Sequence, residues 1–276
     1  MTTTDLARLD RDLALALAIA DEVDAFTLPR FAARDFSVDW KQNRTEVTEI
    51  DRDAESMIAS SIRNERTDHA VFGEEHGLDG DPDSPWRWVL DPIDGTSGYV
   101  RGIPIWATLI ALTHVDHGAV LGVVSAPALG RRWFGGHGLG AQLTALGTTR
   151  EISVSSVGAL TDAQVSVTHN SGWDRLGRSD ALVEFQNRAR RSRGIGDFWQ
   201  HMMVADGTID VAIDAVGVAA YDIAALLPIV EAAGGRLTDR HGVATHEHDT
   251  AVTSNGLLHE EALAAVAPEG LVSRCE

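Results

Sequence analysis

The sequence predicts a mixed fold in which an α+β half is followed by an α/β half. Two helical patterns open the chain, and a run of short strands with glycines between them follows, up to about residue 154. Beyond that point, strands alternate with helical patterns. Because the chain contains neither an internal repeat nor a low-complexity linker, we expect the two halves to pack into one compact unit.

The first half is predicted to begin with two helices and to continue as strands. Residues 4–25 indicate an amphipathic helix, in which leucines recur at three- and four-residue spacing, at Leu6, Leu9, Leu13 and Leu17. Residues 51–64 indicate a second helix with one apolar face. The predicted strands cover residues 70–72, 86–90, 106–113, 120–125, 132–134 and 141–145. Residues 77–85, rich in Gly, Asp and Pro, are predicted to form a solvated loop.

The second half is predicted to alternate between strands and helices. The predicted strands cover residues 151–154, 165–167, 211–213 and 251–253. The predicted helices cover residues 182–191, 198–205, 221–233 and 259–266. We expect residues 221–233 to form one helix despite Pro228 and to end at the glycine pair Gly234 and Gly235.

Composition excludes several classes of protein. The net charge of −18 over 276 residues argues against a nucleic-acid partner or an anionic membrane surface. The single cysteine, Cys275, allows no intramolecular disulfide and fits a reducing compartment. Charged residues interrupt the apolar N-terminal segment, so no signal peptide is predicted, and no stretch approaches a membrane span. We therefore expect a cytoplasmic protein.

The most informative segment is Asp-Pro-Ile-Asp-Gly-Thr at residues 91–96, directly after an apolar strand pattern. Pro92 fixes its own φ and Gly95 permits conformations that other residues avoid. Such a turn can direct Asp91, Asp94 and a backbone carbonyl toward one point, and hard divalent cations prefer such all-oxygen clusters. Taken alone, the Asp-Gly pair fits an ordinary hairpin turn equally well.

Three further acidic segments accompany this turn. They are Val-Thr-Glu-Ile-Asp at 47–51, Val-Phe-Gly-Glu-Glu at 71–75 and Tyr-Asp-Ile-Ala-Ala at 221–225. In this order, the four segments resemble the motifs of the inositol monophosphatase family. The members of this family are lithium-sensitive, magnesium-dependent phosphatases. The resemblance extends from about residue 41 to residue 258. Tyr221 stands where the family usually has Trp, a departure that removes no expected ligand.

The resemblance implies a fold and an assembly. The fold is the layered α-β-α-β-α sandwich of the inositol monophosphatase and fructose-bisphosphatase type. Residues 1–148 would form an α+β half that carries most metal ligands, and residues 149–276 an α/β half that completes a site between the two. The family also implies a homodimer.

The resemblance further implies roles for individual residues. Two or three Mg²⁺ ions, with Mn²⁺ as a substitute, would be held by Asp51, Glu74, Asp91, the carbonyl of Ile93, Asp94 and Asp222. The catalytic set would be Asp51, Glu74 and Thr96, with Asp51 and Thr96 orienting and deprotonating the attacking water. The substrate-binding set would be Gly95, Thr96, Ser97, Arg193, Asp197 and Asp222.

Several of these residues also fit other roles. Asp51 and Asp222 each open a helical pattern, where an acid complements the helix dipole. Lys41 matches a family lysine but also fits a surface position, and Glu75 fits either a direct or a supporting role. His201 fits a residue that faces the substrate or one that only packs.

The substrate prediction depends on Gly196-Asp197 with the nearby Trp199 and His201. This segment looks like the histidinol-phosphate phosphatase branch, whereas inositol monophosphatases usually have small residues there. Asp197 would pair with the amine or imidazole of histidinol phosphate, although it also fits a helix cap. We therefore expect hydrolysis of this phosphate monoester to histidinol and phosphate, a step of histidine biosynthesis. The alternatives are an inositol-1-monophosphatase, another sugar or nucleotide phosphatase of this fold, or a degenerate phosphate-sensing scaffold.

Overall fold

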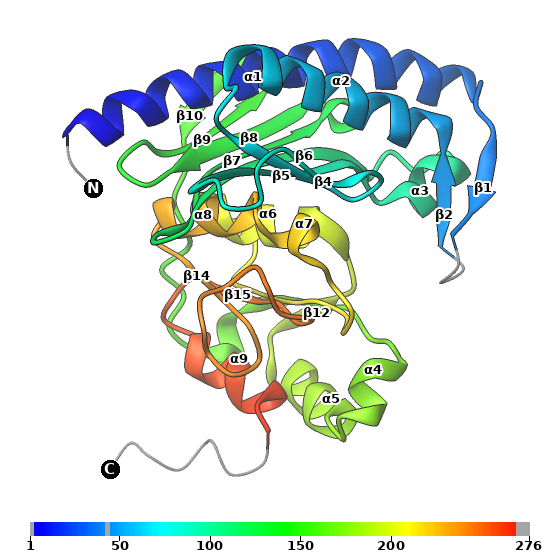
Figure 1. The fold of residues 1–276 in the computed structure, drawn as a ribbon. Coiled ribbons are helices and arrows are strands. Elements are labelled where there is room, and N and C mark those ends of the chain that lie inside the picture. Colours follow the sequence, from blue (N-terminus) through cyan, green and yellow to red (C-terminus); the bar gives the residue numbers. More distant parts are fainter. Residues whose placement is uncertain (1–2, 42–44, 269–276) are drawn as a thin grey trace.

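The computed structural model describes residues 3–41 and 45–268, so Cys275 lies outside the described residues. Helices and sheets alternate in layers (Figure 1). The outer helices α1 (Thr3–Ala33) and α2 (Glu49–Glu65) cover one face of an eight-stranded sheet. The middle layer contains α6 (Asp197–Ala205), α7 (Ala220–Ile223) and α8 (Leu226–Ala232). Below it lie a five-stranded sheet and a last layer of α4 (Ser171–Arg175), α5 (Ser179–Arg188) and α9 (His259–Val266). The predicted α-β-α-β-α sandwich is confirmed.

The eight-stranded sheet has the order β10-β9-β8-β7-β6-β5-β3-β4. Its strands are β3 (Ala70–Gly73), β4 (Gly77–Asp79), β5 (Trp86–Asp94), β6 (Ala107–His114), β7 (Gly118–Ala126), β8 (Arg131–Gly136), β9 (Gly140–Ala145) and β10 (Thr148–Glu151). Neighbouring strands are antiparallel except β3 and β5, which are parallel. Two further strands, β1 (Val38–Trp40) and β2 (Glu46–Thr48), form a separate antiparallel pair.

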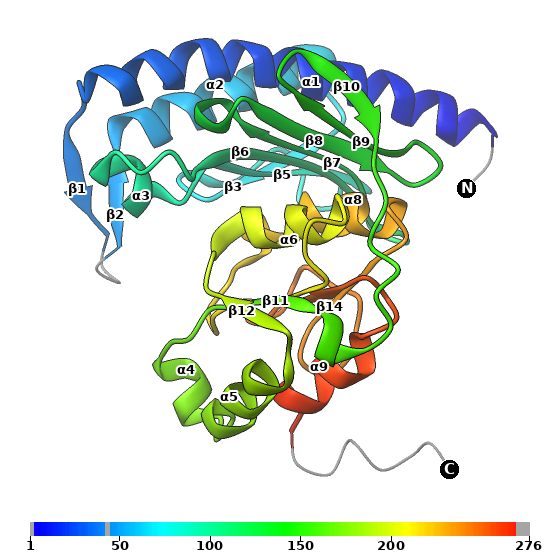
Figure 2. The ribbon, with the colours of Figure 1, turned by 180° about the vertical axis from the view of Figure 1, so that it is seen from behind.

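The five-stranded sheet has the order β12-β11-β13-β15-β14. Its strands are β11 (Gln164–Val167), β12 (Arg191–Arg193), β13 (Val211–Ile213), β14 (Arg236–Thr238) and β15 (Val252–Ser254). β12, β11 and β13 are parallel, and β15 runs antiparallel to both of its neighbours. The chain passes from one sheet to the other between Glu151 and Gln164, a connection that Figure 2 shows descending from β10. The division into two halves near residue 148 stays a prediction.

Two predicted elements differ from the structure. Of the predicted strand 151–154, only Glu151 lies in a strand, as the last residue of β10, and the side chains of Ile152 and Val154 pack into the largest apolar cluster. The predicted helix 221–233 is divided into α7 and α8. The cause is Pro228, which lacks the N–H that would bond to the carbonyl four residues earlier.

Short elements were missed, and longer ones shifted at their ends. Part of the predicted loop 77–85 is β4, which pairs with β3. The elements that no pattern predicted are short or exposed: β1, β2, β12, β14, α4 and α3 (Thr96–Arg101). The helix expected at 182–191 is α5 and ends earlier, because β12 begins at Arg191. Among the described residues, no helix combines the length and apolar character needed to cross a membrane.

The largest apolar cluster lies between the eight-stranded sheet and the middle helices. Trp133 of β8 is fully buried there and contacts Phe198 of α6 edge to face, with ring centroids 6.2 Å apart. Since each large aromatic side chain removes much apolar surface from water, this cluster fixes α6 against the sheet. The ends of β5 and α6 therefore meet in a defined geometry, and the candidate site lies where they meet.

Candidate active site

An irregularity at the end of β5 brings two acids to the same face of the strand. Asp91 is paired with Leu109 and Asp94 with Ala107, so β5 has one more residue than β6 between these pairs. Residues three apart in a regular strand would face opposite sides, and the bulge corrects this. The Thr108 hydroxyl donates to the Pro92 carbonyl at 2.9 Å and satisfies the backbone inside the bulge.

Asp91, Asp94 and Asp222 form an acidic cluster. Each offers a carboxylate oxygen within 4.8 Å of the others. Asp222 comes from α7, where it also accepts a 2.7 Å hydrogen bond from the Ala219 amide. Burial, and then neighbouring carboxylates, raise the pKa values of Asp91 and Asp94 well above the ordinary value. Burial is also the main cause that raises the pKa of Asp222 to about 7. A bound cation would offset the repulsion between these carboxylates, and an all-oxygen donor set suits Mg²⁺.

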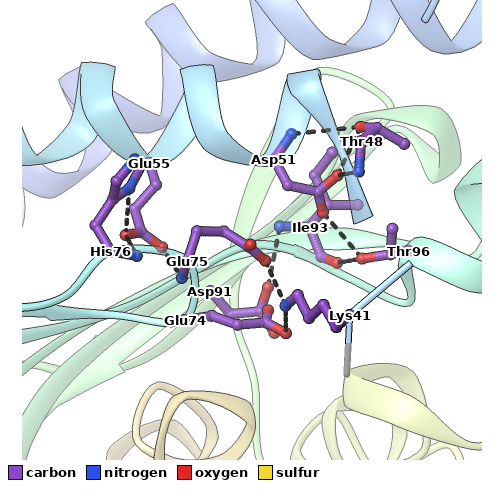
Figure 3. Close-up of polar contacts among 10 residues, drawn as sticks. All are labelled: Lys41, Thr48, Asp51, Glu55, Glu74, Glu75, His76, Asp91, Ile93 and Thr96. Atoms are coloured by element: carbon purple, nitrogen blue, oxygen red, sulfur yellow. Dashed lines mark hydrogen bonds and ion pairs between the residues drawn. The ribbon is translucent and has the colours of Figure 1, made fainter. Parts of the chain in front are cut away.

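Glu74 lies beside this cluster rather than within it. Lys41 donates from Nζ to Glu74 Oε1 at 2.7 Å and to Glu75 Oε1 at 2.6 Å, as Figure 3 shows. Burial lowers the pKa of Lys41, but its hydrogen bonds to the two glutamates more than compensate and raise the pKa above the ordinary value. Lys41 and Glu75 therefore both belong to the polar network of the site.

Glu55 holds the turn that carries Glu74, and no sequence motif identified it. Its buried carboxylate accepts hydrogen bonds of 2.8 Å from the backbone amides of Glu75 and His76 (Figure 3). A Cβ on Gly73 would lie 2.2 Å from the carboxyl carbon of Glu55, which explains the glycine of the Gly-Glu-Glu segment. The signal in the sequence was an acid on the apolar face of α2.

Glu55→Gln is expected to destabilise the fold by about 1–3 kcal/mol and to weaken Mg²⁺ binding, because the single amide oxygen can accept from only one of the two backbone N–H groups and the amide N–H₂ would face the other. Thermal unfolding and the Mg²⁺ concentration for half-maximal activity measure the two effects. Glu65→Gln, the same change at an exposed position of α2, is the control. Equal behaviour of the two variants would show that Glu55 does not hold the turn.

Asp51 both opens α2 and reaches the site. Its Oδ2 accepts hydrogen bonds from the Thr48 amide at 2.8 Å and the Thr48 hydroxyl at 2.6 Å, which completes a capping box. Its Oδ1 accepts from the Thr96 hydroxyl at 2.9 Å. The same hydroxyl lies 2.9 Å from the Ile93 carbonyl (Figure 3). The helix-opening role and the contact with Thr96 therefore hold together.

The glycine turn after β5 leads into α3. Gly95 has φ +86°, and a Cβ there would lie 3.0 Å from the Ile105 carbonyl, so a side chain would be both strained and crowded. Ser97 is exposed, and its hydroxyl accepts a 2.6 Å hydrogen bond from Arg101. The backbone that the sequence assigned to phosphate binding thus lies directly beside Asp94.

Asp94 also links β5 to α6. Its Oδ2 accepts a 2.8 Å hydrogen bond from the Phe198 amide in the first turn of α6. Gly196 is the N-cap of α6 and Asp197 is the first residue of the helix, so the alternative that Asp197 only caps this helix is wrong. The acid that accepts from this part of the helix N-terminus comes from β5, far away in the sequence.

A cavity of about 280 Å³ connects the acidic cluster with α6. Four of its lining residues are acids: Asp94, Asp197, Asp214 and Asp222. Asp197 is exposed to the cavity, and partial burial, followed by the charge of Asp214, raises its pKa to about 6. Sequence reasoning missed Asp214, although it follows an apolar strand directly, as Asp91 does.

Arg193 does not line this cavity. It is exposed on β12 and donates to the carbonyl of the neighbouring Ser192 at 2.7 Å. A larger cavity of about 1170 Å³ also lies in the protein, but none of the predicted site residues lines it. Of the predicted site residues, Asp94, Asp197 and Asp222 line the smaller cavity, and Arg193 does not.

Comparisons with known proteins find relatives in sequence and in fold. A family model described as "Inositol monophosphatase family" matches residues 9–270. A histidinol-phosphatase of Streptomyces coelicolor is 43% identical and one of Mycobacterium tuberculosis 44%, with 91% of this chain and at least 95% of each relative covered. Among solved structures, a Thermotoga maritima IMPase superposes with a TM-score of 0.80 at 30% identity, over 94% of this chain and 96% of that one. The extragenic suppressor protein suhB of Bartonella henselae, at 22% identity and TM-score 0.84 over 94% of this chain and 99% of that one, shares the fold.

Proposed function

This chain belongs to the inositol monophosphatase family, and we propose that it is a magnesium-dependent phosphomonoesterase that hydrolyses histidinol phosphate to histidinol and phosphate. One observation carries the proposal. A single cavity is lined both by acids of the cluster, Asp94 and Asp222, and by the further carboxylates of Asp197 and Asp214. Asp94 and Asp222 would bind the phosphate end of histidinol phosphate through metal ions. Asp197 and Asp214 would bind its cationic end.

The acidic cluster fits the metal ions that the family implies. Asp91, Asp94 and Asp222 would hold Mg²⁺, with Glu74, the Ile93 carbonyl and Asp51 as the further proposed ligands. When bound, Mg²⁺ would neutralise the phosphate oxygens and stabilise the leaving alkoxide. The net charge of −18 would otherwise repel an anionic substrate, and bound cations reverse the local field.

The chain's own residues would orient the reaction. Thr96 would accept a hydrogen bond from the attacking water. As the proton of the water moves to the Thr96 oxygen, the hydroxyl proton of Thr96 would pass to Asp51, whose Oδ1 lies 2.9 Å away. The backbone amides at Gly95, Thr96 and Ser97 would receive phosphate oxygens. The bulge of β5 fixes Asp91 and Asp94 on one face of the strand, so both carboxylates would face the same metal site.

The substrate is tested by comparing kcat/KM for histidinol phosphate, inositol 1-phosphate and 4-nitrophenyl phosphate with Mg²⁺ present. We expect histidinol phosphate to be preferred over inositol 1-phosphate. Asp197→Asn should lower the ratio of histidinol phosphate to 4-nitrophenyl phosphate activity about tenfold, the value of one charge-assisted hydrogen bond.

Asp180→Asn removes the same charge from an exposed position of α5 and serves as the control. A higher kcat/KM for inositol 1-phosphate would refute the substrate. If histidinol phosphate is preferred but Asp197→Asn behaves like the control, the substrate stands and the role of Asp197 does not.

Family membership supports further parts of the same proposal. Lithium would compete with a weakly held magnesium ion, and Mn²⁺ would substitute for Mg²⁺. We also infer a homodimer and a cytoplasmic location. The strong negative charge supports the expectation that neither nucleic acid nor an anionic membrane is a partner.

A further inference from the structure

His201 lies completely buried on α6 and contacts both β15 of the five-stranded sheet and a residue that lines the smaller cavity. Its Nδ1 is 2.7 Å from the Thr253 hydroxyl of β15. Its Nε2 is 3.1 Å from Oδ2 of Asp214, which follows β13. With no exposed surface, the imidazole cannot contact a substrate in the cavity, yet it contacts a residue that does line it.

The hydrogen bonds around Asp214 define which groups donate. An ionised carboxylate can only accept, so His201 Nε2 carries the hydrogen that lies toward Asp214. In the neutral ring, Nδ1 then accepts from the Thr253 hydroxyl. The other oxygen of Asp214, Oδ1, accepts from the Ala215 amide at 2.7 Å. Both carboxylate oxygens are therefore held by protein donors, and the carboxylate has one orientation.

Asp214 shares the cavity with Asp197 but stands outside the cluster of Asp91, Asp94 and Asp222. The position of a Cβ on Gly95 lies 3.7 Å from Oδ2 of Asp197, which places this carboxylate beside the phosphate-binding turn. A substrate with its phosphate at that turn would therefore extend its other end toward carboxylates. Histidinol phosphate carries an amine and an imidazole at that end.

We propose that His201 is a positioning residue for substrate selection: it fixes the carboxylate of Asp214 so that Asp214 and Asp197 together receive the cationic end of the substrate. This inference rests on the proposed function and extends it to His201, whose role the sequence left open, and to Asp214, which no motif identified. A rigid carboxylate loses less freedom on binding, which is why its support affects affinity. His201 thus acts on the substrate only through Asp214.

The test measures kcat and KM for histidinol phosphate and 4-nitrophenyl phosphate in His201→Phe, His201→Gln, Asp214→Asn and the double variant His201→Phe/Asp214→Asn. We expect His201→Phe to lower the ratio of the two kcat/KM values about tenfold, mainly through KM for histidinol phosphate. His201→Gln, which retains an N–H donor, should recover part of the loss. The double variant should be no more impaired in this ratio than Asp214→Asn, because the two residues act as one unit.

His259 provides a matched control. It is also a fully buried histidine of the same half, and its nitrogens lie 3.0 Å from the Thr238 hydroxyl and 2.9 Å from the Ser254 hydroxyl. Neither of these two hydrogen bonds involves the cavity residues Asp197 and Asp214. His259→Phe should lower stability without changing the substrate ratio. Equal loss on both substrates in His201→Phe, or additive losses in the double variant, would overturn the positioning role.

Nitrogen NMR of ¹⁵N-histidine-labelled protein tests the positioning role apart from the substrate. We expect a slowly exchanging proton on Nε2 of His201. The loss of its resonance in His201→Gln assigns it, and the same resonance should shift in Asp214→Asn. A proton on Nδ1 alone would overturn the inference. Failure of the proposed function would show differently, as a wild-type enzyme that does not prefer histidinol phosphate.

Discussion

Asp94→Asn is expected to lower kcat about 10³-fold with Mg²⁺ present and to raise the thermal stability of the metal-free protein. The loss follows from the contribution of a bound cation to charge stabilisation in the transition state, which is several kcal/mol. The gain in stability follows from the cluster itself. Without a cation, burial and mutual repulsion disfavour the ionised forms of Asp91, Asp94 and Asp222, so folding at neutral pH must either hold repelling charges or take up protons. The neutral amide of asparagine avoids this cost.

The fold should survive this substitution. Oδ2 of Asp94 accepts a hydrogen bond from the Phe198 amide, and an asparagine carbonyl oxygen can accept the same bond. The melting temperature is measured in chelator and in excess Mg²⁺, together with kcat. Wild type should gain stability on adding Mg²⁺, Asp94→Asn should gain little, and Asp180→Asn should behave like wild type. Full wild-type activity in excess chelator would end the assignment of this cluster as a metal site.

The layered fold was predictable because its long elements carry strong local patterns. The helix expected at 259–266 has those bounds in the structure, and the strand expected at 141–145 lies within β9. The strands β12 and β14 have three residues each, too few for a periodic pattern to appear. Their pairing is decided by neighbouring strands far along the chain.

The site was predictable as a set of residues but not as a geometry. The turn at 91–96 identifies Asp91 and Asp94, yet only the bulge against β6 explains how both reach one face. Glu55 and Asp214 belong to no motif, because their importance lies in contacts with residues distant in sequence, such as the amide of Glu75 and the imidazole of His201. Arg193 shows the opposite error, since a basic run on an exposed strand resembles a binding residue in sequence alone.

Thr96→Val is expected to lower kcat by about 10²–10⁴-fold, the range for the loss of a positioned proton-transfer group. The Thr96 hydroxyl lies 2.9 Å from both Asp51 Oδ1 and the Ile93 carbonyl, so it is fixed between two acceptors. With its single hydrogen directed to Asp51, its lone pairs are free to accept from the attacking water. Valine has the same shape, but it can neither accept a hydrogen bond from the water nor relay the proton of the water to Asp51.

Three comparisons separate this role from a loss of folding. Thr27→Val removes a buried hydroxyl that donates to the Val23 carbonyl at 2.8 Å in α1, and it should lower stability by about 1 kcal/mol without affecting kcat. Thr96→Ser keeps the hydroxyl and should retain most activity. Because Thr96 and Asp51 would act as a unit, Asp51→Asn/Thr96→Val should be no slower than the slower single variant. Wild-type kcat in Thr96→Val, or independent losses in the double variant, would show that the attacking water is oriented by other groups.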